Sequence, residues 1–134
     1  PDGAIDLETF QQILDLDEDD TFDFSRGMVS AYFTQAAATF TKMDDALAAR
    51  SLPDLSSLGH FLKGSSAALG VARVQASCTR IQHLGTNDAR ADPADALAEI
   101  ARVLARVKRE YAAAERWLRA WFERNVPGGM GEED

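Results

Sequence analysis

The sequence predicts an all-α protein: an antiparallel up-down-up-down four-helix bundle with a short N-terminal capping helix and a long C-terminal helix. Three observations support this class. Apolar residues recur at helical spacing in five separate segments. Alanine is abundant and β-branched residues are few, which favours helix over strand. The four prolines fall in the first turn of an expected helix or between helices.

The first two helices are expected over about 6–16 and 24–49. Asp6 is the expected N-cap of the first, because its side chain can accept hydrogen bonds from main-chain N–H groups that lack a helical partner. An acidic segment, residues 15–20, separates the two helices. The sequence Ser-Leu-Pro at 51–53 ends the second helix.

The third helix is expected over about 54–69, and Gly70 is typical of the residue that ends a helix. A fourth follows and ends at Gly85. Asp92 and Pro93 mark the start of the last helix, which is expected to reach about residue 125 and to span roughly 50 Å. We expect residues 1–127 to form one domain and 128–134 to be a disordered tail.

Composition excludes several classes of partner. The formal net charge is −8, which argues against nucleic acid and against an anionic membrane as the main partner. No apolar run approaches the length of a membrane span, and no signal peptide is recognised. The single cysteine, Cys78, cannot form an internal disulfide, which fits a reducing compartment. It lies on the apolar stripe of its helix, so packing is its expected role.

The segment 59–70 holds the main candidate site. At 100° per residue, one face of its helix is apolar and is expected to face the core; it carries Leu58, Phe61, Leu62, Ser65 and Leu69. The opposite face is expected to be exposed; it carries His60, Lys63, Gly64 and Ala67. His60 therefore projects outward with a cation one turn along and with little side-chain bulk beside it, as a group that another molecule approaches.

Two further residues belong to this prediction. Gln82 falls on the inward side of the next helix, where its amide needs a partner. We expect that amide to hold one imidazole nitrogen of His60 and to leave the other free as a nucleophile. Gly64 lies in mid-helix, where glycine costs about 1 kcal/mol relative to alanine, and the close approach of a partner would offset that cost.

The residues from His60 to Gly70 resemble the signature of histidine-containing phosphotransfer (HPt) proteins. The similarity is greatest to the fungal multistep phosphorelay intermediate, and extends to positions 23–25, 40–43 and 80–85. The resemblance implies that His60 accepts a phosphoryl group and that Lys63, Gly64, Ser65 and Gln82 support it. One position departs from the pattern: this chain has Thr86 where relatives often carry a basic residue, so a second cation is not expected there.

By this resemblance the chain is a phosphohistidine carrier. It would relay a phosphoryl group between aspartates of receiver domains, those of a hybrid sensor histidine kinase and of downstream response regulators. It would work as a monomer in the cytoplasm and nucleus. The residues offer a nucleophile and a cation but no Walker-type loop and no catalytic base beside His60, so autonomous kinase activity is not expected. No cofactor is expected on this chain, and Mg²⁺ is expected on the partner receiver domain.

Alternatives remain for other parts of the chain. The acidic segment is not read as an EF-hand loop, because the sixth position is Asp20 and the twelfth is Arg26. It is either a solvated loop or a charged rim that orients a partner. No metal site is expected, since His60, His83 and Cys78 lack the spacing of zinc ligands.

The docking surface for receiver domains is expected around His60, Gly64 and Ala67. Residues at the end of the first helix and in the acidic segment are expected to contribute to it: Ile13, Leu14 and Leu16 as apolar contacts, with Asp15, Asp17, Asp19 and Asp20 as the rim. The alternative function is a helical module that docks receivers without phosphotransfer. The presence of both His60 and Lys63 favours the carrier, and a hydrolytic enzyme ranks third.

Overall fold

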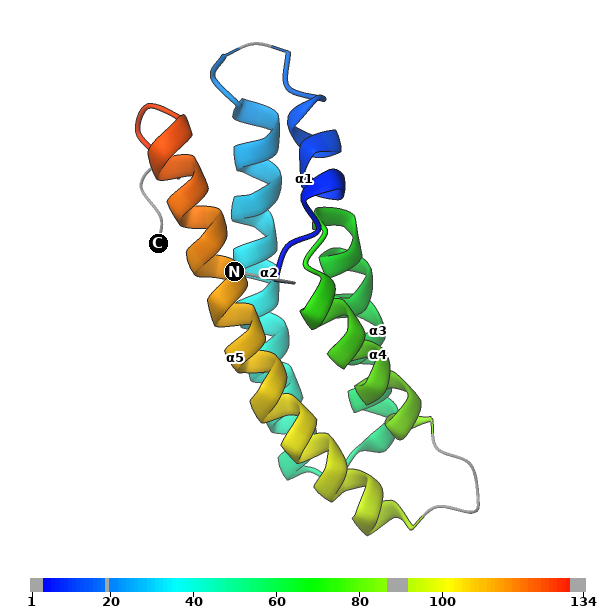
Figure 1. Ribbon diagram of the computed structural model, residues 1–134. Coiled ribbons are helices and arrows are strands. Elements are labelled where there is room, and N and C mark those ends of the chain that lie inside the picture. The colour runs from blue at the N-terminus through cyan, green and yellow to red at the C-terminus, as the bar shows by residue number, and fades with distance from the viewer. Residues whose placement is uncertain (1–3, 19, 87–91, 131–134) are drawn as a thin grey trace.

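The computed structural model describes residues 4–18, 20–86 and 92–130 (Figure 1). Those residues form five α-helices and contain no strand. The helices are α1 Leu7–Leu14, α2 Asp23–Ala48, α3 Leu52–Leu69, α4 Ala72–Gly85 and α5 Pro93–Asn125. Helices α2 to α5 alternate in direction and form the antiparallel bundle that the sequence predicts (Figure 1). The all-α prediction is therefore confirmed.

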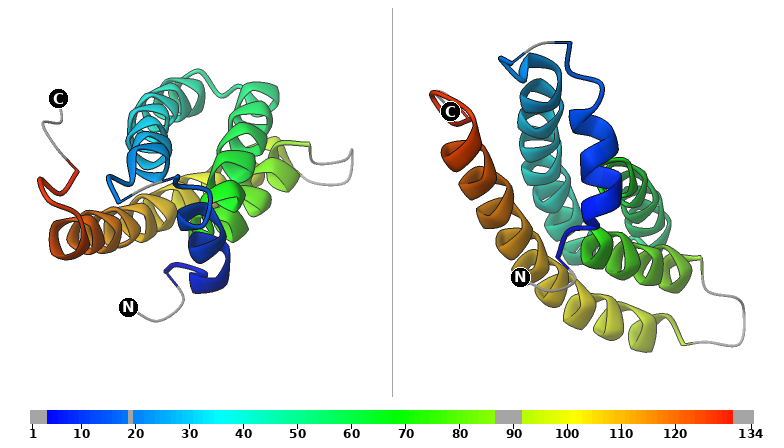
Figure 2. Two further views of the ribbon diagram at one scale, coloured as in Figure 1. Left: turned by 90° about the horizontal axis from the view of Figure 1, so that it is seen from above. Right: turned by 45° about the horizontal axis from the view of Figure 1, so that its top comes forward.

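Helix α1 lies beside α2 and α3, against the end of the α3–α4 pair (Figures 1 and 2). One aromatic residue of α1, Phe10, packs against the C-terminal half of α5. Phe10 is 2 % exposed, and its ring meets those of Trp117, Trp121 and Phe122 edge-on at centroid distances of 5.5, 5.3 and 6.3 Å. Edge-to-face packing is a favourable arrangement of aromatic rings. The short helix thus buries a part of α5 that lies beyond the end of α3.

Helix ends follow the local signals in the sequence. Asp6 accepts hydrogen bonds from the N–H groups of Glu8 and Thr9, and Asp92 caps α5 in the same way. Gly70 ends α3 in the left-handed conformation, with φ of 78°. The start of α3 differs from the prediction, because Ser51 caps the helix and Pro53 lies in its first turn. Helix α3 therefore begins at Leu52.

Glycines let α3 and α4 approach each other closely. A Cβ atom at Gly85 would lie 2.7 Å from the carbonyl oxygen of Leu52 and 2.8 Å from the Cβ of Ser56. A Cβ at Gly59 would lie 3.0 Å from the carbonyl oxygen of Cys78. Cys78 itself is fully buried in this contact, so its expected packing role is confirmed. The backbone of the helix that carries His60 is thus held directly against α4.

The buried stripe of α3 is rotated from the predicted one. Phe61, predicted to face the core, is 48 % exposed, whereas Ser66 is fully buried. The reason is that α3 packs against both α2 and α4, so its buried face points between them. The hydroxyl of Tyr32, on α2, forms a 2.8 Å hydrogen bond with that of Ser66 and allows a polar side chain inside.

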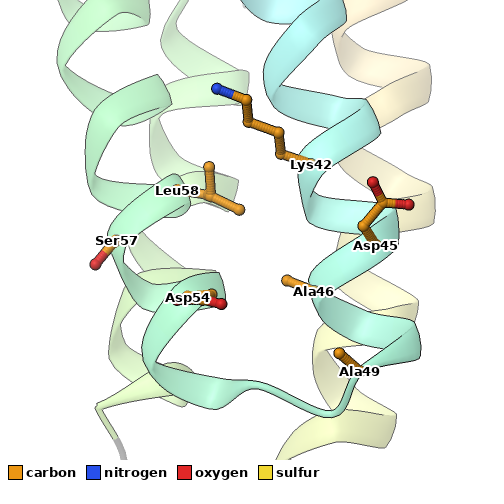
Figure 3. A pocket seen from close by; sticks show the side chains of 7 residues that line it. All are labelled: Lys42, Asp45, Ala46, Ala49, Asp54, Ser57 and Leu58. Carbon is orange, nitrogen blue, oxygen red and sulfur yellow. The ribbon is translucent and has the colours of Figure 1, made fainter.

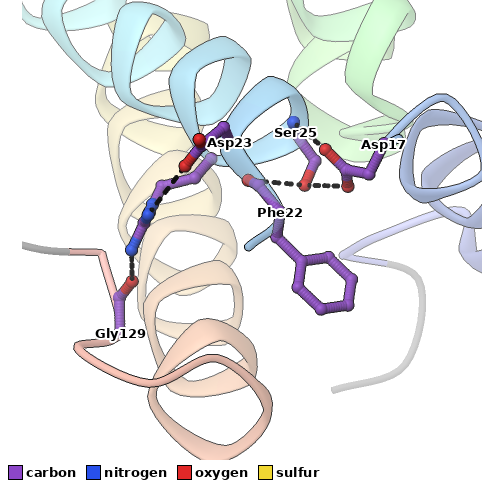
Figure 4. Close-up of polar contacts among 6 residues, drawn as sticks. Asp17, Phe22, Asp23, Ser25 and Gly129 are labelled. Atoms are coloured by element: carbon purple, nitrogen blue, oxygen red, sulfur yellow. Dashed lines mark hydrogen bonds and ion pairs between the residues drawn. The ribbon is translucent and has the colours of Figure 1, made fainter. Parts of the chain in front are cut away.

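The C-terminal end also differs from the prediction. Residues 128–130, expected in a disordered tail, form a turn, and Met130 is only 5 % exposed. Arg26 of α2 donates a 3.1 Å hydrogen bond to the carbonyl oxygen of Gly129 (Figure 4). The packing of the Met130 side chain extends the ordered chain past the proline at 127. The other tail residues, 131–134, lie outside the described part of the chain.

Candidate active site on α3

His60 lies on the exposed face of α3. A Cβ atom at Gly64, one turn along, would meet nothing within 4 Å. Ala67 is half-buried on the same side. Within the described residues the imidazole makes no hydrogen bond, so both of its nitrogens remain available. Of the four residues predicted on the exposed face, His60 and Gly64 are exposed, whereas Lys63 and Ala67 are half-buried.

Lys63, three residues after His60 on α3, forms a side-chain hydrogen bond with Gln82 of α4. The Nζ atom of Lys63 donates a 2.9 Å hydrogen bond to Oε1 of Gln82, across the interface between α3 and α4. Both side chains are half-buried. The amide of Gln82 thus holds the cation and not the imidazole, so the predicted contact with His60 is wrong. The charge and length of Lys63, which reaches across the interface, explain the difference.

The main chain of Gln82 is fixed as well. Its carbonyl oxygen accepts hydrogen bonds from Oγ of Ser56, at 3.1 Å, and from Oγ1 of Thr86, at 3.2 Å. Thr86 therefore contributes a hydroxyl to the end of α4 and no cation. A Cβ at Gly59 would lie 3.1 Å from the Gln82 nitrogen, so a larger residue there would press on this segment.

Ser65 lies apart from this pair. Its hydroxyl donates a 3.3 Å hydrogen bond to the carbonyl oxygen of Phe61. It also lines a shallow recess of about 180 Å³ against α2, beside Tyr32 and Gln35. The structure therefore brings Lys63 and Gln82 together and leaves Ser65 on the α2 side of α3.

The three apolar docking residues predicted at the end of the first helix differ in burial. Ile13 is 5 % exposed and belongs to the core, so it is not available for docking; its place beside Phe10 on the apolar stripe explains this. Leu14 is half-buried and packs against the core. Leu16, just after the helix, is 61 % exposed. Of the three, Leu16 remains a docking candidate with its side chain free.

The acidic segment also has more than one role. Asp17 caps the start of α2: its carboxylate accepts hydrogen bonds from the N–H and the hydroxyl of Ser25, at 2.9 and 2.6 Å (Figure 4). This structural role was not predicted. Asp15 and Asp20 are exposed, as a rim requires. Asp19 lies outside the described residues.

Two aromatic residues are exposed that the sequence does not predict to be exposed. Phe24 is 49 % exposed and lines a recess of about 270 Å³ together with Leu16, Glu18, Thr21 and Asp23. Phe61, 48 % exposed, is the neighbour of His60 in the chain. The helical period predicts that Phe61 faces the core. It is exposed because Ser66 is buried in its place, where the hydroxyl of Tyr32 on α2 gives Ser66 a hydrogen-bond partner.

Several other features of the described residues lie outside this site. A groove of about 470 Å³ between α2 and α3 is lined by mixed charges and small side chains: Lys42, Asp45, Ala46, Ala49, Asp54, Ser57 and Leu58 (Figure 3). Burial raises the pKa of the Cys78 thiol to about 12, so it remains protonated at neutral pH. In the described part of the chain no three His, Cys, Asp or Glu residues are arranged to hold a metal ion. No described helix is both long and apolar enough to cross a membrane.

Comparison with known proteins identifies relatives of this chain. Multistep phosphorelay regulator 1 of Schizosaccharomyces pombe is 41 % identical over 127 residues, which cover 90 % of this chain and 43 % of the relative. The phosphorelay intermediate protein YPD1 of Saccharomyces cerevisiae is 44 % identical over 86 residues, covering 63 % of this chain and 51 % of the relative. The chain thus spans about half the length of these relatives, or less.

A solved structure shows the same fold. In the co-crystal structure of the Saccharomyces cerevisiae histidine phosphotransfer signalling protein Ypd1 with the receiver domain of its downstream response regulator Ssk1, Ypd1 matches with a TM-score of 0.82 and 30 % identity. The match covers 94 % of this chain and 99 % of Ypd1. The family model of the Hpt domain matches residues 27–117, which include α3 and α4 and therefore His60, Lys63 and Gln82. As the resemblance of residues 60–70 predicted, this chain belongs to the Hpt-domain family.

Proposed function

We propose that the chain is a phosphohistidine carrier that relays a phosphoryl group between aspartates of receiver domains in a multistep phosphorelay. The observation that carries the proposal is the exposed imidazole of His60 on α3 of an Hpt-domain fold, with open space at Gly64 and the Lys63 cation one turn along. A carrier needs an accessible nucleophile and neutralisation of phosphate charge, and little else.

The transfer step is a single displacement at phosphorus. A ring nitrogen of His60 attacks the phosphoryl group of a receiver aspartyl phosphate with its lone pair. The P–N bond forms while the P–O bond breaks, and the aspartate leaves as a carboxylate. The reverse step, toward a second receiver, regenerates the free imidazole. Mg²⁺ is expected on the receiver domain, where it would neutralise charge on the phosphoryl oxygens.

Receiver domains are the partners that fit this face. The relative Ypd1 has been crystallised with a receiver domain of a response regulator, which supports the same class of partner here. The proposed apolar contacts are the exposed side chains of Leu16 and Phe24, which line one recess, and of Phe61, next to His60 in the chain; Asp20 is the proposed charged rim. The receivers of a hybrid sensor histidine kinase and of downstream regulators are the proposed donor and acceptors.

The chain is further proposed to act as a monomer in the cytoplasm and nucleus. A net charge of −8 disfavours self-association. The free, buried thiol of Cys78 fits a reducing compartment.

The test is label transfer from a receiver domain phosphorylated with radioactive phosphate. Acid-labile label is expected on the parent chain and on His83→Gln, whose histidine is also exposed, and none on His60→Gln. Label on His60→Gln would assign the acceptor elsewhere. A parent chain that binds the receiver but takes no label would instead support the second function, a docking module that uses the apolar residues around Phe61 without phosphotransfer.

A further inference from the structure

We propose that Gln82 is a positioning residue for Lys63, a role that rests on the proposed function. Its amide holds the Lys63 ammonium beside His60 before transfer, and releases it to the phosphoryl group afterwards. The proposal is based on the 2.9 Å hydrogen bond that Nζ of Lys63 donates to Oε1 of Gln82. In the described part of the chain no carboxylate forms an ion pair with Lys63.

The position of Gln82 is set by the close contact of α3 and α4. Hydrogen bonds from Ser56 and Thr86 hold its carbonyl oxygen, and Gly59 leaves room for its main-chain nitrogen. A lysine side chain has many rotamers, and its restriction has an entropic cost. Because the acceptor on the neighbouring helix is fixed, the Lys63 side chain is already restricted in the folded protein, before a receiver binds.

The geometry also lets Lys63 leave Gln82. Residues at i and i+3 on a helix are neighbours, with about 5–6 Å between their Cβ atoms, so the flexible Lys63 side chain can reach a group on His60. A phosphoryl group carries nearly two negative charges, whereas the amide of Gln82 is neutral. Charge-assisted hydrogen bonds are the stronger kind. Phosphorylation of His60 therefore draws the ammonium from the amide to the phosphate.

The neutrality of the amide is what this role requires. A carboxylate at the same place would also hold Lys63, but as an ion pair that competes with the phosphoryl group. The change Gln82→Glu keeps the size and shape of the side chain and adds only charge. Gln82→Ala removes the acceptor altogether. Gln82→Ala therefore tests whether Lys63 must be held, and Gln82→Glu tests whether the group that holds it must be uncharged.

The experiment measures two quantities for each purified variant: the initial rate of label acceptance from a phosphorylated receiver, and the half-life of the phosphohistidine. The variants are Gln82→Ala, Gln82→Glu, Lys63→Ala and the double variant Lys63→Ala/Gln82→Ala. Gln75→Ala and Gln75→Glu are the matched controls, since Gln75 lies two turns earlier on α4 and is also half-buried. Circular dichroism confirms folding, and His60→Gln sets the background.

Gln82→Ala is expected to slow acceptance two- to fivefold with little change in half-life. Gln82→Glu is expected to shorten the half-life severalfold, toward that of Lys63→Ala. The decisive result is the double-mutant cycle: in the Lys63→Ala background, Gln82→Ala should change acceptance by less than about 1.5-fold, because there is no cation left to hold.

An equal slowing by Gln82→Ala in both backgrounds would overturn the proposal, because Gln82 would then act on the imidazole or on the fold. A half-life unchanged by Gln82→Glu would overturn it as well. Failure of the proposed function is a different result, since the parent chain itself would then carry no label above the His60→Gln background.

Discussion

An added methyl group at Gly85 tests the close approach of α3 and α4. The new Cβ of Gly85→Ala would lie 2.8 Å from the Cβ of Ser56 and 2.7 Å from the carbonyl oxygen of Leu52. Non-bonded carbon atoms normally lie at least about 3.5 Å apart, so the two helices must separate by roughly 0.7 Å. The atoms in the way belong to the backbone or lie next to it, and therefore have no rotamer by which to move aside.

The cost of this overlap can be set against the gain in helix propensity. Overpacking of a tight contact costs about 1–3 kcal/mol. Alanine is favoured over glycine in a helix interior by up to about 1 kcal/mol, and by less at the last residue of α4. We therefore expect the free energy of unfolding to fall by about 1–2 kcal/mol, which lowers the midpoint of urea denaturation by roughly 0.5–1 M.

The measurement is urea unfolding followed by circular dichroism, with Gly64→Ala as the control. No atom within 4 Å opposes a Cβ at Gly64, so the same substitution there is expected to raise stability by about 0.5–1 kcal/mol. The two variants should therefore shift in opposite directions. A Gly85→Ala protein as stable as the parent would show that α3 and α4 are not held at this distance.

Four further expectations concern the site and its supports. Gly64→Gln should fold normally and accept label slowly in the transfer assay, because its side chain stands where the receiver approaches. Leu16→Asp should weaken receiver binding at both low and high salt, whereas Asp20→Asn should change it modestly and mainly at low salt. Asp17→Ala should lower the free energy of unfolding by about 1 kcal/mol, as loss of a cap does; an unchanged urea midpoint would contradict the cap at the start of α2. The Cys78 thiol should resist alkylation at pH 8 in the folded protein, because burial raises its pKa to about 12. The free energy that the buried neutral thiol contributes to folding is therefore complete below about pH 9 and is lost as the pH rises toward 12, so the urea midpoint should be lower at pH 10 than at pH 8.

The fold could be predicted because its signals are local. Asp6, Gly70 and Asp92 act at the helix ends where the sequence places them, since capping depends on a few neighbouring residues. Helix α3 begins two residues earlier than the sequence predicts, because Pro53 is compatible both with the end of one helix and with the first turn of the next. Both readings fit the local sequence, and only the cap at Ser51 decides between them.

The site was predictable in part, for a related reason. The exposure of His60 and Gly64 follows from helical period alone. Which stripe of α3 is buried depends on two neighbouring helices, so the helical period alone places Phe61 on the wrong face. The partner of Gln82 depends on the reach of a lysine across an interface, which no period describes. The burial of Ile13 likewise follows from the core that α1 covers.

The contact between Lys63 and Gln82 constrains the number of residues that connect α3 to α4. Only Gly70 and Val71 separate α3 from α4. One residue inserted there would rotate every α4 side chain by about 100° relative to α3 and turn Gln82 away from Lys63. The same insertion just before Asp92 would leave the register of α3 and α4 unchanged. Variants of this domain that keep the lysine and the glutamine should therefore also keep the two-residue turn, while their α4–α5 connection is free to vary in length.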